Sequence, residues 1–220
     1  RVLTEDLKLK PGNRVLLRAP NNPMMAACWL AVVKAGLVAV PTMPLLRAAE
    51  LKQIIDKARV GAALCDLRLK DEMELARAAC RDMKQVLYFN DGGAGSLEQR
   101  LAAKPTSFRN VDTAADDACM IAFTSGTTGQ AKGTVHFHRD VLAMCDCFPR
   151  SCLKPTRDDI FCGTPPLAFT FGLGGLLCFP MRFGASTVLM ERLTPDTLLG
   201  TIQKMKATIC FTAPTNYRQM

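Results

Sequence analysis

The 220-residue sequence has no apolar run of about 20 residues, the length that a membrane-spanning helix needs. Its first residues lack the pattern of a secretory signal peptide, and no internal repeat or low-complexity tract is present. Aromatic residues make up only 6% of the chain, whereas 49% of it is hydrophobic. This composition excludes a disordered, fibrous or membrane-spanning class and predicts a globular protein with a sizeable core.

Histidine is scarce, with only His136 and His138 in the chain, whereas cysteine is plentiful, with ten residues. Cys145 and Cys147 form the only close cysteine pair, and a zinc site would need further ligands at suitable spacing. We therefore expect no metal site among these histidines and cysteines. Most of the other cysteines lie beside apolar residues, as do Cys28, Cys119, Cys178 and Cys210. This context is typical of small core residues in a reducing compartment, so we expect a cytoplasmic location and no disulfide framework.

The formal net charge is +8, yet the chain has no run of basic residues interleaved with aromatics. Lys and Arg are instead scattered among Asp and Glu. A nucleic-acid module often needs such a basic and aromatic surface, so neither nucleic acid nor a membrane is expected as a partner. We interpret the positive net charge as a solvated basic surface, which would suit a polyphosphate ligand.

Strand and helix patterns alternate along the chain, which predicts an α/β fold of layered, mainly parallel sheets with flanking helices. Helices are expected at 23–34, 49–59, 72–83, 139–147, 172–179 and 195–205. Strands are expected at 14–19, 38–41, 61–65, 85–89, 118–123, 133–137, 159–163, 185–190 and 208–212.

The alternation stops between residues 90 and 117, where the sequence is polar and irregular. The run 92–95 is rich in glycine, but it lacks the spacing of a dinucleotide-binding fingerprint and no helix clearly follows it. We interpret this stretch as a surface connection. It divides the chain into two expected regions, 1–117 and 118–220.

The segment 124–133 combines glycines, hydroxyl side chains and one lysine. The glycines allow the backbone to approach an anion closely, and the hydroxyl groups can donate hydrogen bonds to phosphate oxygens. Lys132 adds a positive charge, and exposed backbone N–H groups would complete an anion-binding concavity. The expected phosphate-binding residues are Thr124, Ser125, Gly126, Thr127, Thr128, Gly129 and Lys132.

This segment is not a Walker-type loop, which has Gly before its Lys and Ser or Thr after it. Here Ala131 precedes Lys132, Gly133 follows it, and the next element is expected to be a strand. The segment instead resembles the Thr-Ser-Gly-Thr-Thr-Gly-x-Pro-Lys-Gly loop of the adenylate-forming superfamily, with Ala131 where Pro is usual. That superfamily includes acyl- and aryl-CoA ligases, the adenylation domains of peptide synthetases, and firefly luciferase.

The resemblance covers nearly the whole chain. The stretches 20–23, 31–36, 40–41 and 44–46 are similar to the first core region of these ligases, and 135–139 is similar to the strand and helix start after the loop. The resemblance implies an AMP-forming acid–thiol ligase in which Lys132 is the catalytic residue. It also implies a structural place for His136 and His138, in preference to a role as catalytic bases.

The resemblance further suggests which acid is activated. Peptide-synthetase domains carry an Asp near residues 165–175, and no Asp occurs between Asp159 and Glu191. Benzoate-type ligases carry Phe-Ala-Tyr-Gly-Leu-Gly there, and residues 169–174 read Phe-Thr-Phe-Gly-Leu-Gly. Two Phe rings offer flat apolar surface to an aromatic ring, and the glycines are interpreted as leaving room for a ligand. An aryl acid such as benzoate or 2-aminobenzoate is expected, bound by Phe169, Thr170, Phe171 and Gly172.

Several motifs of the family have no counterpart in the 220 residues. These are Tyr-Gly-x-Thr-Glu, whose Glu is associated with Mg²⁺, the ribose-binding Asp, the hinge, and the C-terminal domain with its own Lys. We therefore expect residues 1–220 to be part of a large N-terminal AMP-binding domain, with the C-terminal domain of the same enzyme as a partner. ATP, Mg²⁺ and CoA are the expected cofactors and co-substrates. A ligase for a fatty or other acyl acid, and a non-catalytic nucleotide-binding fragment, are the alternatives.

Overall fold

The computed structural model describes residues 1–125 and 131–220. The chain forms two compact units, the first built from Arg1–Ala19 and Ala27–His138, the second from Pro20–Ala26 and Arg139–Met220. The main division therefore falls after residue 138, whereas the sequence suggested 117. The reason is that the strand after residue 117 pairs with the sheet of the first unit. None of the helices in the described ranges has the length and apolarity that crossing a bilayer requires.

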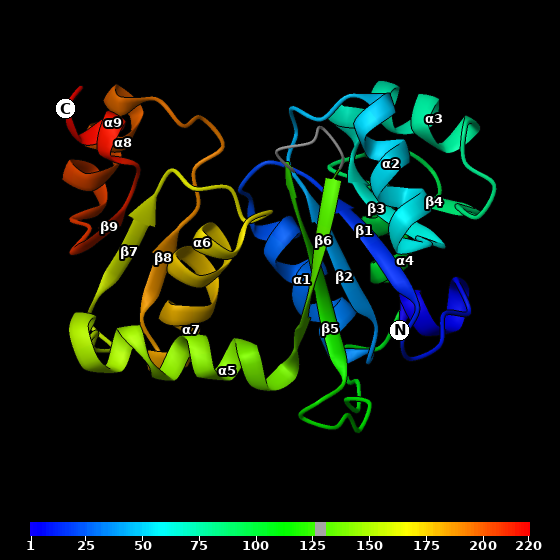
Figure 1. Ribbon diagram of the computed structural model, residues 1–220, viewed down its shortest axis with the longest axis horizontal. Helices are drawn as coiled ribbons and strands as arrows, with labels where there is room; N and C mark the ends of the chain where they lie inside the picture. Colours follow the sequence, from blue (N-terminus) through cyan, green and yellow to red (C-terminus); the bar gives the residue numbers. More distant parts are fainter. Residues whose placement is uncertain (126–130) are drawn as a thin grey trace. The chain divides into compact units, whose positions relative to one another are not determined.

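The first unit is built on a six-stranded sheet in the order β4-β3-β1-β2-β5-β6 (Figure 1). All of its pairings are parallel except that between β5 and β6, which is antiparallel. The strands are β1 (Arg14–Arg18), β2 (Val38–Thr42), β3 (Ala62–Asp66), β4 (Gln85–Phe89), β5 (Ala118–Ser125) and β6 (Ala131–Phe137). The α/β prediction with mainly parallel strands is confirmed.

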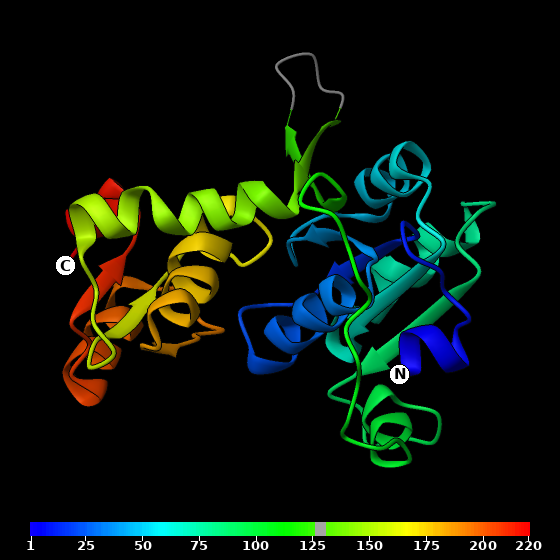
Figure 2. The ribbon, with the colours of Figure 1, turned by 90° about the horizontal axis from the view of Figure 1, so that it is seen from below.

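Helices cover both faces of this sheet. They are α1 (Pro23–Lys34), α2 (Ala48–Ala58), α3 (Lys70–Ala78) and α4 (Leu97–Ala102), with a π-helical turn η1 (Val2–Asp6) and a 3-10 turn η2 (Leu67–Leu69). Figure 2 shows α1 and α2 on opposite sides of the strands. This arrangement follows from right-handed crossovers, because the chain passes from β1 to β2 in one direction and from β2 to β3 in the other.

The apolar stripe of α2 forms much of the core on its face of the sheet. Leu51, Ile54 and Ile55 are buried there with strand residues such as Leu16 and Val40. Burying each of these side chains stabilises the fold by about 1.5–3 kcal/mol. The helix begins with the Glu50 carboxylate accepting from the Arg47 backbone N–H and ends at Arg59, a left-handed residue.

The second unit contains a three-stranded parallel sheet in the order β8-β7-β9. Its strands are β7 (Ile160–Gly163), β8 (Ser186–Val188) and β9 (Ile209–Phe211). The helices are α5 (His138–Asp146), α6 (Thr170–Leu173), α7 (Phe179–Phe183), α8 (Pro195–Met205) and α9 (Pro214–Tyr217), with π-helical turns η3 (Pro149–Leu153) and η4 (Gly174–Cys178).

The stretch 90–117 is more ordered than the sequence suggested. It contains α4, whose first turn is capped by the Ser96 hydroxyl accepting from the Gln99 backbone N–H. Farther along, the Val111 N–H donates to the Lys34 carbonyl at the end of α1. The prediction that no helix follows 92–95 was wrong, because a helix of only six residues leaves little periodic pattern.

Candidate functional site

The predicted phosphate loop connects β5 to β6. Their antiparallel register pairs Thr124 with Lys132 and Ser125 with Ala131. Side chains directly opposite each other in such a pair lie on one face, about 4.5–5.5 Å apart at Cβ. The exposed Thr124 and Lys132 are therefore neighbours at the end of the hairpin, which projects beyond the sheet in Figure 2. Gly126, Thr127, Thr128 and Gly129 lie outside the described residues.

The start of β6 is fixed by α2. The Lys57 ammonium, in the last turn of α2, donates to the Ala131 carbonyl at 2.8 Å. The Ala131 side chain packs against the core that α2 forms with the sheet. These two contacts hold the backbone next to Lys132, although Ala131 stands where the family loop usually has Pro.

Gly133 has a packing role in this hairpin. A Cβ at this position would lie 3.0 Å from Ile121 Cγ2 and 3.1 Å from the Phe123 ring, which belongs to its cross-strand partner. The aromatic ring thus covers the glycine backbone. The last glycine of the motif therefore has a role in strand pairing.

His136 lies near the end of β6 and His138 begins α5, and both are tied to β5 or the residues just before it through their backbones. The His136 carbonyl accepts from the Cys119 thiol, and the His138 N–H donates to the Asp117 carbonyl at 3.2 Å. Both side chains are half-buried. These backbone contacts agree with a structural place for the histidines.

The predicted acid-binding residues follow the carboxyl end of β7, in the second unit. Phe169 precedes α6, while Thr170, Phe171 and Gly172 form most of it. Phe169 is 37% exposed and Phe171 is 51% exposed, whereas Gly172 is buried. The two rings are thus accessible at an edge of a parallel sheet where ligands commonly bind.

Asn21 fixes the segment that leads to these residues. Its side-chain amide donates to the Pro165 carbonyl at 2.9 Å, and its Oδ1 accepts from the Leu167 N–H at 2.8 Å. Asn21 is 3% exposed, so both hydrogen bonds are shielded from water. Sequence reasoning noticed the stretch 20–23 only as part of a resemblance and missed this function, because 144 residues separate Asn21 from Pro165.

The interpretation that the glycines around α6 leave room for a ligand was wrong. A Cβ on Gly172 would lie 2.1 Å from the Pro166 carbonyl oxygen. A Cβ on Gly174 would be 3.1 Å from Met144 Sδ, and one on Gly175 would be 2.8 Å from the Phe211 ring. Neighbouring atoms of the protein fill the space that these glycines provide.

Phe211, the last residue of β9, supports the aromatic edge. Phe171 meets its ring edge-on with centroids 5.8 Å apart, and Phe161 lies nearly parallel to it at 6.2 Å.

A polar cluster lies beside Phe211, at the ends of β7 and β9. Thr164 and Thr212 share a hydroxyl hydrogen bond of 2.6 Å, and the Asn216 amide donates to both hydroxyl oxygens. Sequence reasoning missed these residues, although their place just after two parallel strands was a usable signal.

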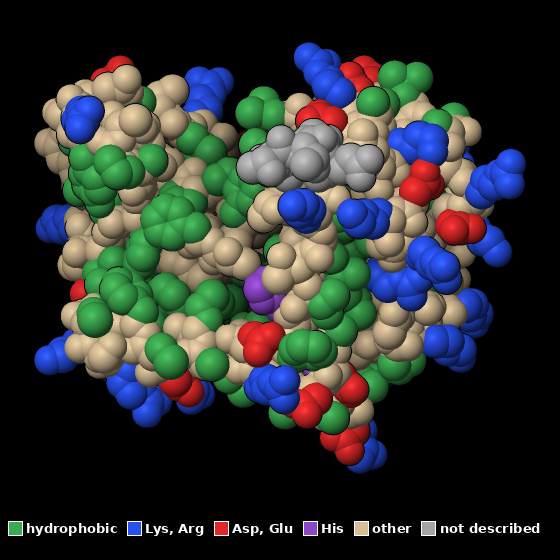
Figure 3. Space-filling model, in the orientation of Figure 1, with side chains coloured by type: hydrophobic (Ala, Val, Ile, Leu, Met, Phe, Trp, Pro, Cys, Tyr) green, Lys and Arg blue, Asp and Glu red, His purple; other side chains and the backbone are tan. Residues whose placement is uncertain are grey.

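The described surface is basic but mixed in charge. On the face shown in Figure 3, Lys and Arg side chains are interspersed with Asp and Glu.

Within residues 1–125 and 131–220, no three His, Cys, Asp or Glu side chains come together as a metal site. Mg²⁺ prefers oxygen ligands, carboxylates above all, and the described hairpin end offers only the Thr124 hydroxyl beside an ammonium group. These residues do not by themselves fit an Mg²⁺ ion.

Comparison with known proteins gives a consistent result. A family model described as AMP-binding enzyme matches residues 1–220. The benzoate–CoA ligase of Thauera aromatica is 28% identical over 219 residues, which is 99% of this chain and 42% of the relative. The anthranilate–CoA ligase of Pseudomonas aeruginosa is 27% identical over 96% of this chain and 41% of its own length.

A solved structure extends the likeness to three dimensions. The crystal structure of the anthranilate CoA ligase AuaEII in complex with anthranoyl-AMP has a TM-score of 0.92 and 28% identity, over 97% of this chain and 42% of that one. The chain thus spans 41–42% of the length of these relatives.

Proposed function

Because the chain belongs to the AMP-binding enzyme family, we propose that the protein carrying it is an AMP-forming ligase that joins an aryl acid to CoA. Benzoate or 2-aminobenzoate is the proposed type of substrate. The observation that carries this proposal is the β5–β6 hairpin, which pairs Thr124, the first residue of the Thr-Ser-Gly-Thr-Thr-Gly run, with Lys132, which follows that run. The ten free cysteines suit a reducing compartment such as the cytoplasm.

The proposed reaction has two steps. The ionised carboxylate attacks the α-phosphate of ATP, which gives an acyl-adenylate and releases pyrophosphate. The CoA thiol then attacks the acyl carbon, and AMP leaves. The first step needs no general base because the acid is already ionised.

Lys132 has a defined task in the first step. Negative charge accumulates on the departing pyrophosphate, and a fixed ammonium group beside it lowers the barrier. The Lys57 contact to Ala131 and the packing of Gly133 on Phe123 hold the backbone on both sides of Lys132. The Thr124 hydroxyl and the loop residues Ser125, Gly126, Thr127, Thr128 and Gly129 are proposed to bind the same phosphates.

We propose no contacts with the described residues for Mg²⁺ or for CoA. Mg²⁺ would neutralise phosphate charge when bound, and CoA is the second substrate. The described residues do not by themselves fit the ion, so no step is assigned to it. The part of the protein that receives CoA is proposed to lie beyond these 220 residues.

The aryl preference is supported by the exposed rings of Phe169 and Phe171. Phe171 packs edge-on against Phe211, so its ring is held in a set orientation. Aromatic pairs of this kind are worth about 0.5–1.5 kcal/mol, and a substrate ring is proposed to join the same aromatic cluster. Relatives named as benzoate–CoA and anthranilate–CoA ligases agree with this choice of acid.

A matched pair of lysine variants tests the phosphate role. In the full-length protein, Lys132→Ala is expected to slow acid-dependent ATP–pyrophosphate exchange by about 10²–10³, the usual effect of removing one charge-stabilising donor. Lys204→Ala, at an exposed position on α8, should leave the rate unchanged. Equal rates for Lys132→Ala and the parent protein would rule out the proposed role of Lys132.

A further inference from the structure

Two of the free cysteines lie side by side in the second sheet. Cys162 of β7 and Cys210 of β9 are direct partners in the parallel register. Neighbouring strands are about 4.8 Å apart, and paired side chains point to the same face. The Cα separation of a disulfide is about 4.4–6.8 Å. The backbone therefore already holds the two residues at a distance that a disulfide can span.

The two thiols differ in their access to solvent. Cys162 is fully buried in a small core with Met190 and Leu198. Cys210 is only half-buried at the edge of the same core. A small oxidant can therefore reach Cys210 directly, while Cys162 lies behind it.

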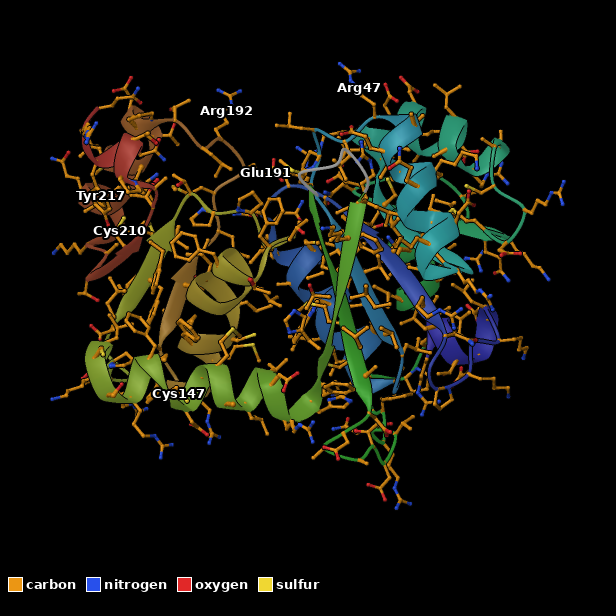
Figure 4. All side chains as sticks on the ribbon, viewed as in Figure 1. Arg47, Cys147, Glu191, Arg192, Cys210 and Tyr217 are labelled. Atoms are coloured by element: carbon orange, nitrogen blue, oxygen red, sulfur yellow. The ribbon has the colours of Figure 1, made fainter. Side chains whose placement is uncertain are left out.

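Hydrogen bonds favour the reactive form of Cys210. The Cys162 thiol hydrogen-bonds to Cys210, which lowers the pKa of Cys210 and raises that of Cys162. The Tyr217 hydroxyl contacts the same residue, donating to the Cys210 carbonyl at 3.1 Å and further lowering the pKa of its thiol. Figure 4 shows Tyr217 and Cys210 together at the outer side of β9. A lowered pKa increases the thiolate, which is the nucleophile in thiol oxidation.

We propose that Cys210 and Cys162 form an oxidisable dithiol, in which a peroxide attacks Cys210 and Cys162 closes the disulfide. The Cys210 thiolate attacks one peroxide oxygen, so that an S–O bond forms and the O–O bond breaks. The departing hydroxide takes up a proton as water. The Cys162 sulfur then attacks the Cys210 sulfur, the S–S bond forms, the S–O bond breaks, and the thiol proton leaves with the hydroxide as a second water. Two electrons pass from the thiols to hydrogen peroxide.

This modification site goes beyond the proposed ligase reaction and does not depend on it. Its position nevertheless gives it a bearing on the acid site, because Cys210 directly precedes Phe211, which supports Phe171. The remaining cysteines serve as internal comparisons. Cys145 and Cys178 also form a thiol pair, but both are buried. Cys147 and Cys152 are exposed, and Figure 4 shows Cys147 well separated from Cys210.

The test is peptide mapping by mass spectrometry after native treatment of the full-length protein with hydrogen peroxide, followed by acid quenching and blocking of free thiols. The expected result is a cross-linked pair of peptides containing Cys162 and Cys210, two hydrogen atoms lighter than the reduced peptides. Reduction with dithiothreitol should remove the cross-link. The proposal is overturned if Cys162 and Cys210 stay reduced while other cysteines oxidise, or if no cysteine reacts.

Cysteine variants distinguish the role of Cys210, which the peroxide attacks, from that of Cys162, which closes the disulfide. Cys162→Ala should stop the reaction at a sulfenic acid on Cys210, detected as a dimedone adduct that the parent protein loses as its disulfide forms. Cys147→Ala is the matched control and should leave the Cys162–Cys210 cross-link unchanged. A cross-link that forms to another cysteine in the Cys162→Ala variant at the parent rate would contradict the pairing.

Discussion

At the scale of single residues, Gly172 shows how backbone packing limits which side chains the predicted acid-binding segment can accommodate. Its missing side chain faces the Pro166 carbonyl oxygen, only 2.1 Å from where a Cβ would lie. We expect Gly172→Ala to destabilise the fold by about 1–3 kcal/mol, the usual cost of overpacking. Urea unfolding followed by circular dichroism measures this difference.

Gly200→Ala is the matched control for that prediction. Gly200 lies inside α8, and no atom lies within 4 Å of the position that an added Cβ would take. Alanine there should raise the free energy of unfolding by about 0.5–1 kcal/mol, because it restricts the unfolded chain and favours helix. Equal effects of the two substitutions would show that the close approach at Gly172 does not exist.

The residue types in the sequence led to a prediction of acid-binding side chains but not of the contacts that support them. Phe169 and Phe171 were predicted to bind the acid, and both rings are exposed; their role stays a prediction. Phe211 and Asn21 were not identified, because their partners lie far away in sequence and only the fold brings them together. The role of Gly133 in packing against Phe123 also depends on strand register, which no local pattern specifies.

At the scale of elements, Asn21 connects the stretch before α1 to the segment before α6. Asn21→Ala would leave the Pro165 carbonyl and the Leu167 N–H without their partner, and a buried unpaired group costs about 1–3 kcal/mol. We expect a loss of about 2–4 kcal/mol in unfolding free energy and a higher KM for the acid. Asn110→Ala, at an exposed position, should change neither, and the same null result for Asn21→Ala would contradict the proposed clamp.

Element boundaries were predictable where capping chemistry marks them. Helices α1 and α8 begin at Pro23 and Pro195, as expected, because Pro suits the first helical position and a side-chain cap precedes each. The helix α4 was missed because its six residues follow a glycine-rich run and give no period. The Ser96 cap was the one local sign of it.

At the scale of the whole molecule, the 220 residues are expected to be insufficient for turnover. The Glu of Tyr-Gly-x-Thr-Glu and the Lys of a C-terminal domain are absent from this sequence. Purified residues 1–220 should therefore give no CoA thioester from ATP, CoA and benzoate, measured by mass spectrometry. Full-length protein is the positive control, and thioester formed by the 220 residues alone would show that they suffice for turnover.

The proposed aryl-acid ligase activity is tested most directly by ATP–pyrophosphate exchange in the full-length protein with a panel of acids. We predict that benzoate or 2-aminobenzoate gives a kcat/KM at least about tenfold above that of octanoate, equal to about 1.4 kcal/mol of preferential transition-state stabilisation. Exchange that favours octanoate, or that no carboxylic acid stimulates, would contradict the proposal of an aryl-acid ligase.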